Sequence, residues 1–159
     1  MNIWKRKFDS DIQKKRKPIS KENKERFNQL HNEFLKLLIK IGSINENIFQ
    51  DIEEKSQRPN LKVISINLDP SLKLGEESLK ITDQMIKLLP DRAVPWTCRA
   101  LALGSLFRFE EALLANEQAI EIDPSDPEKW ELQSSILDSL ERKVEAQEAR
   151  EKAARLRSL

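Results

Sequence analysis

The stretch AVPWTCRALALGSLFRFEEALLANEQAIEIDPSD, residues 93 to 126, contains two short segments with the periodicity of amphipathic helices. In the first segment, apolar or small residues recur at spacings of four, three and four, at Trp96, Ala100, Leu103 and Phe107. In the second segment, small and apolar residues share one helical face, at Ala112, Ala119 and Ile122. Asp123-Pro124 predicts the end of the second helix, because proline cannot continue the helical hydrogen-bond ladder. The stretch therefore predicts two antiparallel helices packed on each other.

A shift of 34 residues superposes this stretch on the sequence that precedes it and on the sequence that follows it. Trp96 falls on Trp130, and Pro90 falls on Pro124. Two positions of the second helix coincide in three copies, at Ser78, Ala112 and Ala146 and at Met85, Ala119 and Ala153. A helix pair of this length cannot bury its apolar stripe alone, whereas stacked copies bury it between them. The sequence thus predicts tandem helix pairs.

These residues resemble the tetratricopeptide repeat family. The likeness is carried by Trp96, Ala100, Leu103, Ala112, Ala119 and Pro124, and in the next copy by Trp130, Leu137, Ala146 and Ala153. It implies an all-α fold, a right-handed α-solenoid of about three tetratricopeptide-like helix pairs. The residues in front of the repeats predict that an N-terminal helical pair precedes it. We expect repeats over residues 59–159, with a degenerate unit at 59–92 followed by units at 93–126 and 127–159.

The sequence departs from the family pattern at the turns within the pairs. Where the family places a glycine, this chain has Lys73, Phe107 and Glu141, so we expect distorted turns. Pro70 interrupts what should be the first helix of the 59–92 unit. The residues alone leave open whether 59–74 forms a short helix, an extended segment or a degenerate repeat.

Residues 20–58 are expected to form a helical pair in front of the repeats. Ser20 is a helix cap and Gly42 a helix stop, and the apolar residues between them share one face, at Phe27, Leu30, Phe34, Leu37, Leu38 and Ile41. Ser43 and Glu46 have the spacing of a capping box, which predicts a second helix to about Lys55. The apolar stripe either caps the first repeat or allows homo-oligomerisation through the helix at 20–41.

Residues 1–19 form a basic arm that we expect to be flexible. Between Lys5 and Arg26 there are 10 Lys and Arg against 4 acidic residues, including the run Lys14, Lys15, Arg16 and Lys17. An alternative function follows from this run, in which the protein binds nucleic acid or an anionic membrane through the arm. The more favoured interpretation of the arm is a solvated tail.

Groups that carry catalysis or bind cofactors are sparse in this sequence. The three glycines are isolated, so no phosphate-binding loop is indicated, and His31 and Cys98 are the only histidine and the only cysteine. We expect no enzyme activity, no cofactor and no metal site. A lone cysteine in a predicted amphipathic helix fits a reducing compartment, and no apolar run reaches the length of a membrane span, so we expect a cytoplasmic protein.

The expected function is that of a scaffold or adaptor that binds a protein or peptide partner on its concave surface. The resemblance implies that the first helix of each pair lines this surface. Helical spacing then nominates the stripe opposite the packing face, at Val94, Thr97, Leu101 and Ser105 in one unit and at Glu128, Glu131, Ser135 and Asp138 in the next. The second stripe is acidic, which favours a basic or amphipathic partner.

Overall fold

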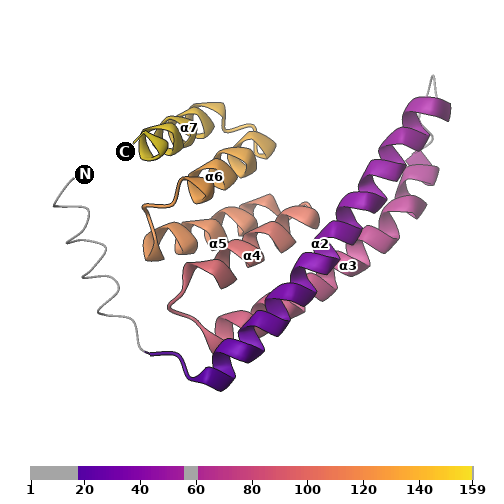
Figure 1. The fold of residues 1–159 in the computed structure, drawn as a ribbon. Helices are drawn as coiled ribbons and strands as arrows, with labels where there is room; N and C mark the ends of the chain where they lie inside the picture. The colour runs from indigo at the N-terminus through magenta and orange to yellow at the C-terminus, as the bar shows by residue number, and fades with distance from the viewer. Residues whose placement is uncertain (1–17, 56–60, 159) are drawn as a thin grey trace.

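A computed structural model describes residues 18–55 and 61–158, and within these ranges the chain forms six helices and no strand (Figure 1). The helices are α2 (Lys21–Lys55), α3 (Leu61–Leu88), α4 (Ala93–Ser105), α5 (Phe109–Ile122), α6 (Pro127–Ser139) and α7 (Lys143–Arg157). The all-α fold predicted from the sequence is confirmed.

The helices pack as three successive antiparallel pairs, α2 with α3, α4 with α5, and α6 with α7. Neighbouring pairs meet where α3 contacts α4 and where α5 contacts α6, so the chain builds a continuous array (Figure 1). Helix α2 also touches α4. Each pair therefore covers part of the core of the next one, as in other helical repeat proteins.

The 34-residue register predicted from the sequence matches equivalent places in the structure. Ser78, Ala112 and Ala146 are all fully buried, and so are Met85 and Ala119 at the second matched position. Small residues at the first position let the second helix of each pair approach its neighbours closely.

The two matched tryptophans make the same contact one repeat apart. The indole N–H of Trp96 donates to the Pro90 carbonyl, and that of Trp130 donates to the Pro124 carbonyl, each at 3.0 Å. Both tryptophans are partly buried.

The N-terminal helical pair expected at 20–58 is wrong, because a single continuous helix, α2, spans Lys21–Lys55. Ser20 does cap this helix, accepting a hydrogen bond from the Asn23 N–H at 3.1 Å. Ser43, by contrast, caps nothing, since its hydroxyl donates back to the Ile39 carbonyl within the same helix. An isolated glycine such as Gly42 costs a helix only about 1 kcal/mol, and that is too little to end a helix packed along a partner.

The sequence left the form of 59–74 open within the degenerate unit expected at 59–92, and the structure gives one helix, Leu61–Leu88. The interruption expected at Pro70 is wrong, because Pro70 lies inside this helix. Proline removes one hydrogen bond of the helical ladder but leaves the ladder intact on either side. Helix α3 packs along α2, which is longer still and supplies the tertiary contacts that hold α3 helical. Helix α2 thus takes the place of the missing first helix, and the array holds two pairs of tetratricopeptide length after one longer pair.

The turns inside the two short pairs are regular, contrary to the distortion expected. Phe107 and Glu141 adopt left-handed backbone conformations, with φ of 59° and 61°, where the family pattern has glycine. The following N–H groups make matching bonds, Arg108 to the Leu103 carbonyl at 3.0 Å and Arg142 to the Leu137 carbonyl at 2.9 Å. The turn therefore has the backbone conformation that a glycine would adopt, and a residue with a side chain at positive φ strains the backbone there. Lys73, the third matched position, lies inside α3 and forms no turn.

The apolar stripe of α2 is buried inside the molecule. Phe34 and Leu30 belong to one hydrophobic core with Met85 of α3 and Leu103 of α4. This burial favours the capping interpretation of the stripe over self-association through it. Two apolar residues of α2 outside the predicted stripe, Leu35 and Ile39, stay exposed.

Candidate functional site

The stripe nominated on α4 is the least buried face of that helix. Val94 is 45% exposed and Leu101 is 37% exposed, whereas the remaining faces of α4 contribute Ala93, Pro95, Cys98, Ala100, Ala102 and Leu103 to the core. Thr97 and Ser105 are partly exposed between them. Their hydroxyls donate to carbonyls of their own helix, Thr97 to Ala93 at 3.3 Å and Ser105 to Ala102 at 2.7 Å. The stripe therefore offers an approaching partner an uncharged surface with few free hydrogen-bond donors.

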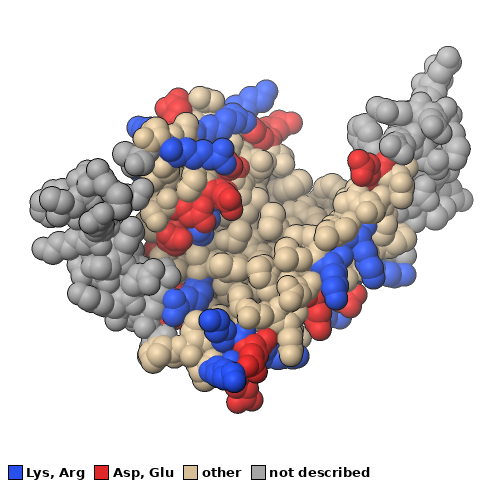
Figure 2. Space-filling view, in the orientation of Figure 1, with Lys and Arg blue, Asp and Glu red and all other residues tan. Residues whose placement is uncertain are grey.

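The stripe nominated on α6 is exposed at all four positions, Glu128, Glu131, Ser135 and Asp138. Figure 2 shows acidic side chains gathered over α6, whereas the middle of the molecule, over α4 and the adjoining part of α2, is largely uncharged. The structure thus places the two predicted stripes on the first helices of successive pairs, one uncharged and one acidic.

Arginines of α7 match two of the three acidic residues on α6. Arg157 lies 2.8 Å from Glu131, and Arg150 pairs with Asp138. These pairs are exposed, so they weaken the negative potential of the stripe more than they stabilise the fold. No ion pair joins Glu128 to a cation within the described part of the chain. The negative charge open to a partner is therefore concentrated at Glu128, at the start of α6.

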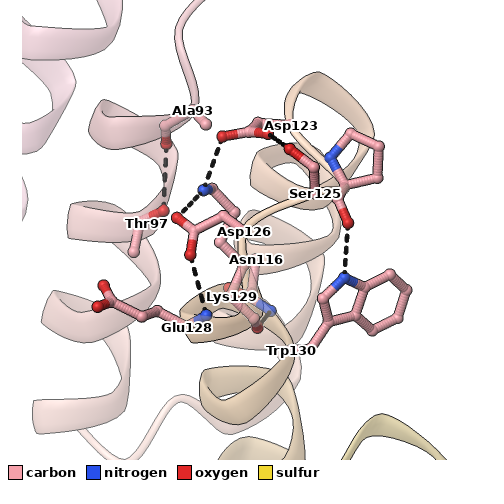
Figure 3. A network of polar contacts seen from close by, with 10 residues as sticks. Ala93, Thr97, Asn116, Asp123, Ser125, Asp126, Glu128, Lys129 and Trp130 are labelled. Atoms are coloured by element: carbon pink, nitrogen blue, oxygen red, sulfur yellow. Dashed lines mark hydrogen bonds and ion pairs between the residues drawn. The ribbon is translucent and has the colours of Figure 1, made fainter. Parts of the chain in front are cut away.

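A buried polar network fixes where α6 begins (Figure 3). Lys129 as a whole is only 5% exposed, and its ammonium group pairs with Asp126 and lies 3.1 Å from an Oδ of Asp123. Asp126 accepts a hydrogen bond from the Glu128 N–H at 3.0 Å, and the side-chain amide of Asn116 in α5 donates to the Lys129 carbonyl at 3.0 Å. The first turn of α6, which carries Glu128, is therefore held by Asp126 in the preceding loop and by Asn116 in α5.

The same network sets the charge of Asp123. Burial raises the pKa of this carboxyl, but hydrogen bonds from the Ser125 hydroxyl and the Lys129 ammonium outweigh burial, so the pKa lies below its usual 3.8. The Ser125 hydroxyl donates to Asp123 at 2.9 Å. Asp123 is therefore a carboxylate at neutral pH, and together with Asp126 it gives the buried Lys129 its ion-pair partners.

Leu35 and Ile39 of α2 are functional candidates that the sequence analysis did not nominate. Leu35 is 43% exposed and Ile39 is 69% exposed. They are spaced one helical turn apart, beside the predicted stripe rather than in it. Two apolar residues next to an already complete packing stripe are the signal that would have singled them out.

Two surface hollows lie away from these stripes. One of about 710 Å³ lies between α3 and the α4–α5 turn, where Leu72, Glu76 and Arg108 line it, and one of about 230 Å³ lies between α4 and α5, where Trp96 and Leu114 line it. The stripes themselves form an open surface, suited to a peptide or a protein segment rather than to a small molecule enclosed on all sides.

The structure also bears on the basic run, the cysteine, and the possible metal and membrane sites considered from the sequence. The basic run at Lys14, Lys15, Arg16 and Lys17 lies outside the described residues. Cys98 is buried in the core, and burial raises the pKa of its thiol to about 12. In residues 18–55 and 61–158, no group of His, Cys, Asp and Glu is arranged to hold a metal ion, and no helix is both long and apolar enough to cross a membrane.

Comparison with known proteins gives a structural likeness only. No family model and no curated protein matches the sequence. Among solved structures, MamA of MSR-1 superposes with a TM-score of 0.51 at 18% identity, over 76% of this chain and 71% of that one. MamA of AMB-1 superposes with a TM-score of 0.50 at 18% identity, over 76% of this chain and 67% of that one. Like these tetratricopeptide-like proteins, the chain folds as an all-α helical repeat.

Proposed function

We propose that this protein is a binding scaffold of the tetratricopeptide type, which holds a peptide or protein segment across the stripes of α4 and α6 and performs no chemistry of its own. The observation that carries the proposal is the exposure of Val94 and Leu101 on a helix whose other apolar residues are buried or partly buried. An apolar residue kept in water gains free energy when a partner covers it. Val94 and Leu101 lie on one face of α4, so a single bound segment can cover both.

The rigidity of the array supports the same proposal. Helix α4 is held between α3 and α5, and α6 is held by α5, by α7 and by the network around Lys129. The stripes therefore keep their relative positions before a partner arrives, so little conformational entropy is lost on binding. The unoccupied charge of Glu128 favours a partner with a basic residue at the α6 end.

The test is selection of peptides from a random library displayed on phage, with the purified protein as bait. Selected peptides are then synthesised, and their affinities are measured by calorimetry for wild type and for Leu101→Asp. We expect at least a tenfold loss in the variant, because a charge in the middle of the stripe must be desolvated under the partner.

Leu114→Asp is the matched control. Leu114 lies on α5, is 63% exposed and is absent from both stripes, so the same change there tests for a general effect of a new surface charge. Both variants should keep the helical spectrum and the melting temperature. Peptides that bind wild type and Leu101→Asp equally well, or a bait that enriches no peptide, would refute the proposal.

A further inference from the structure

We propose that α2 forms part of the binding surface, where Leu35 and Ile39 extend the uncharged stripe of α4, and that the segment bound is amphipathic, with an apolar face on α2 and α4 and a basic end at Glu128. This inference rests on the proposed function. It adds α2 as a third helix of the binding surface and specifies that the bound segment is amphipathic with a basic end.

The faces of α2 show on which side its exposed apolar residues lie. Leu30, Phe34, Leu37 and Ile41 form the buried stripe. On one side of this stripe, Phe27 and Leu38 are partly buried against the core, and Leu35 and Ile39 follow next around the helix. On the other side, the exposed residues are charged, at Arg26, Glu33 and Lys40. Among the described helices, α2 contacts α3 and α4.

The exposed face that contains Leu35 and Ile39 carries no charge over four turns of α2. Its residues follow the helical spacing of four, three, four and three, at Asn28, Asn32, Leu35, Ile39 and Gly42, and all five are exposed. In a chain of which 35% of residues are charged, this row meets charged residues at its two ends, Lys24 and Glu46. Figure 2 shows a largely uncharged area over α4 and the adjoining part of α2, and α2 contacts α4.

Charge sets the direction of the bound segment. Helix α2 and α4 contribute uncharged residues, and α6 contributes carboxylates of which Glu131 and Asp138 already pair with arginines of α7. Of the three acidic residues on α6, Glu128 is the one that forms no ion pair within the described residues, so its charge can pair with a partner. A segment that lies across the three first helices therefore matches apolar side chains at its α2 and α4 end and a lysine or arginine at its α6 end.

The first experiment measures how peptides selected on the wild-type protein bind the double variant Leu35→Gln, Ile39→Gln. Glutamine keeps the helix propensity close to that of leucine, so a loss of binding reports the contact rather than the helix. We expect at least a tenfold loss of affinity. The control is Glu33→Gln, Lys40→Gln on the opposite side of α2, which should bind like wild type.

The outcomes separate the two proposals. If Leu101→Asp loses binding and Leu35→Gln, Ile39→Gln does not, α2 is not part of the surface, and this inference fails while the proposed function stands. If neither variant loses binding, both fail. If wild type dimerises in sedimentation and the α2 variant is monomeric, the face belongs to a second copy of the chain, and the inference is overturned.

The second experiment tests the direction. Glu128→Lys should weaken the selected peptides, and replacing the terminal lysine or arginine of the peptide with glutamate should restore binding to this variant alone. Selected peptides with no basic residue, or a double exchange without recovery, would overturn the assignment of a basic end to Glu128.

Discussion

Two glycines of long helices should respond to the same substitution in opposite ways. Gly42 lies in α2 and Gly75 lies in α3, both far from helix ends. Replacing a glycine inside a helix with alanine stabilises the helix by about 1 kcal/mol, because alanine loses less backbone entropy on folding. At Gly42 a new Cβ has nothing within 4 Å, so Gly42→Ala should raise the free energy of unfolding by about that amount.

At Gly75 the gain is opposed by a collision. A Cβ there would lie 2.7 Å from Cδ2 and 2.9 Å from Cγ of Leu106, and 3.1 Å from the Ser105 hydroxyl. Leu106 packs against the hydrophobic core and lines the hollow beside α3, so it must shift from its packed position to make room for the new Cβ. Overpacking of this kind costs ~1–3 kcal/mol, which exceeds the gain in propensity over most of that range. We expect Gly75→Ala to lower the free energy of unfolding by up to ~2 kcal/mol.

Urea and thermal unfolding, followed by circular dichroism, measure both variants. For a chain of this size, 1 kcal/mol corresponds to about 2–4 °C in melting temperature, so the two alanine variants should fall on opposite sides of wild type. A Gly75→Ala protein as stabilised as Gly42→Ala would show that Leu106 does not press on α3, and the described packing of α4 on α3 would be wrong.

Three further changes test other parts of the structure. Glu141→Gly should raise stability by up to ~1 kcal/mol in urea unfolding because it relieves a positive φ, whereas Glu141→Ala should not, and equal effects would contradict the left-handed turn. Asp123 has a lowered pKa in the folded state, so it stabilises the protein at neutral pH and this contribution is lost as the pH falls through the ordinary value of 3.8 toward the folded pKa. The stability difference between wild type and Asp123→Asn should therefore be constant above about pH 5 and shrink below it, and a constant difference down to about pH 3 would refute this. Cys98, whose pKa burial raises to about 12, should resist Ellman's reagent at pH 8 until urea unfolds the protein, and rapid labelling of the folded protein would contradict its burial.

Repetition made the second half of the array predictable from the sequence. A spacing of 34 residues between Trp96 and Trp130 is visible without any structure, and the small residues at Ala112 and Ala146 fix which faces meet. The exposed stripes of α4 and α6 followed from the same spacing. Once the packing face of a helix is known, its opposite face is known as well.

The N-terminal half was not predictable in the same way, because its helices are decided by each other rather than by local signals. Gly42 and Pro70 are both helix-ending residues in isolation, and both lie inside helices here. The contacts between α2 and α3 outweigh the local preferences for ending a helix. Such contacts join segments that are distant in the chain, so they cannot be predicted from either segment alone. In the C-terminal half, the ion pairs of Glu131 and Asp138 with arginines of α7 were not predicted either, because they too depend on contacts between two helices.

The great length of α2 gives the protein a mechanical property that the short pairs lack. At 1.5 Å per residue, its 35 residues extend about 52 Å, whereas the 13 residues of α4 extend about 20 Å. The α2/α3 pair is anchored to the array at one end only, through α4 (Figure 1). A rotation of about 10° at α4 would therefore move the far end of α2, about 21 Å beyond the buried Ile41, by about 4 Å. A small rearrangement under a bound partner is thus enlarged into a displacement that a spectroscopic ruler between α2 and α7 can follow.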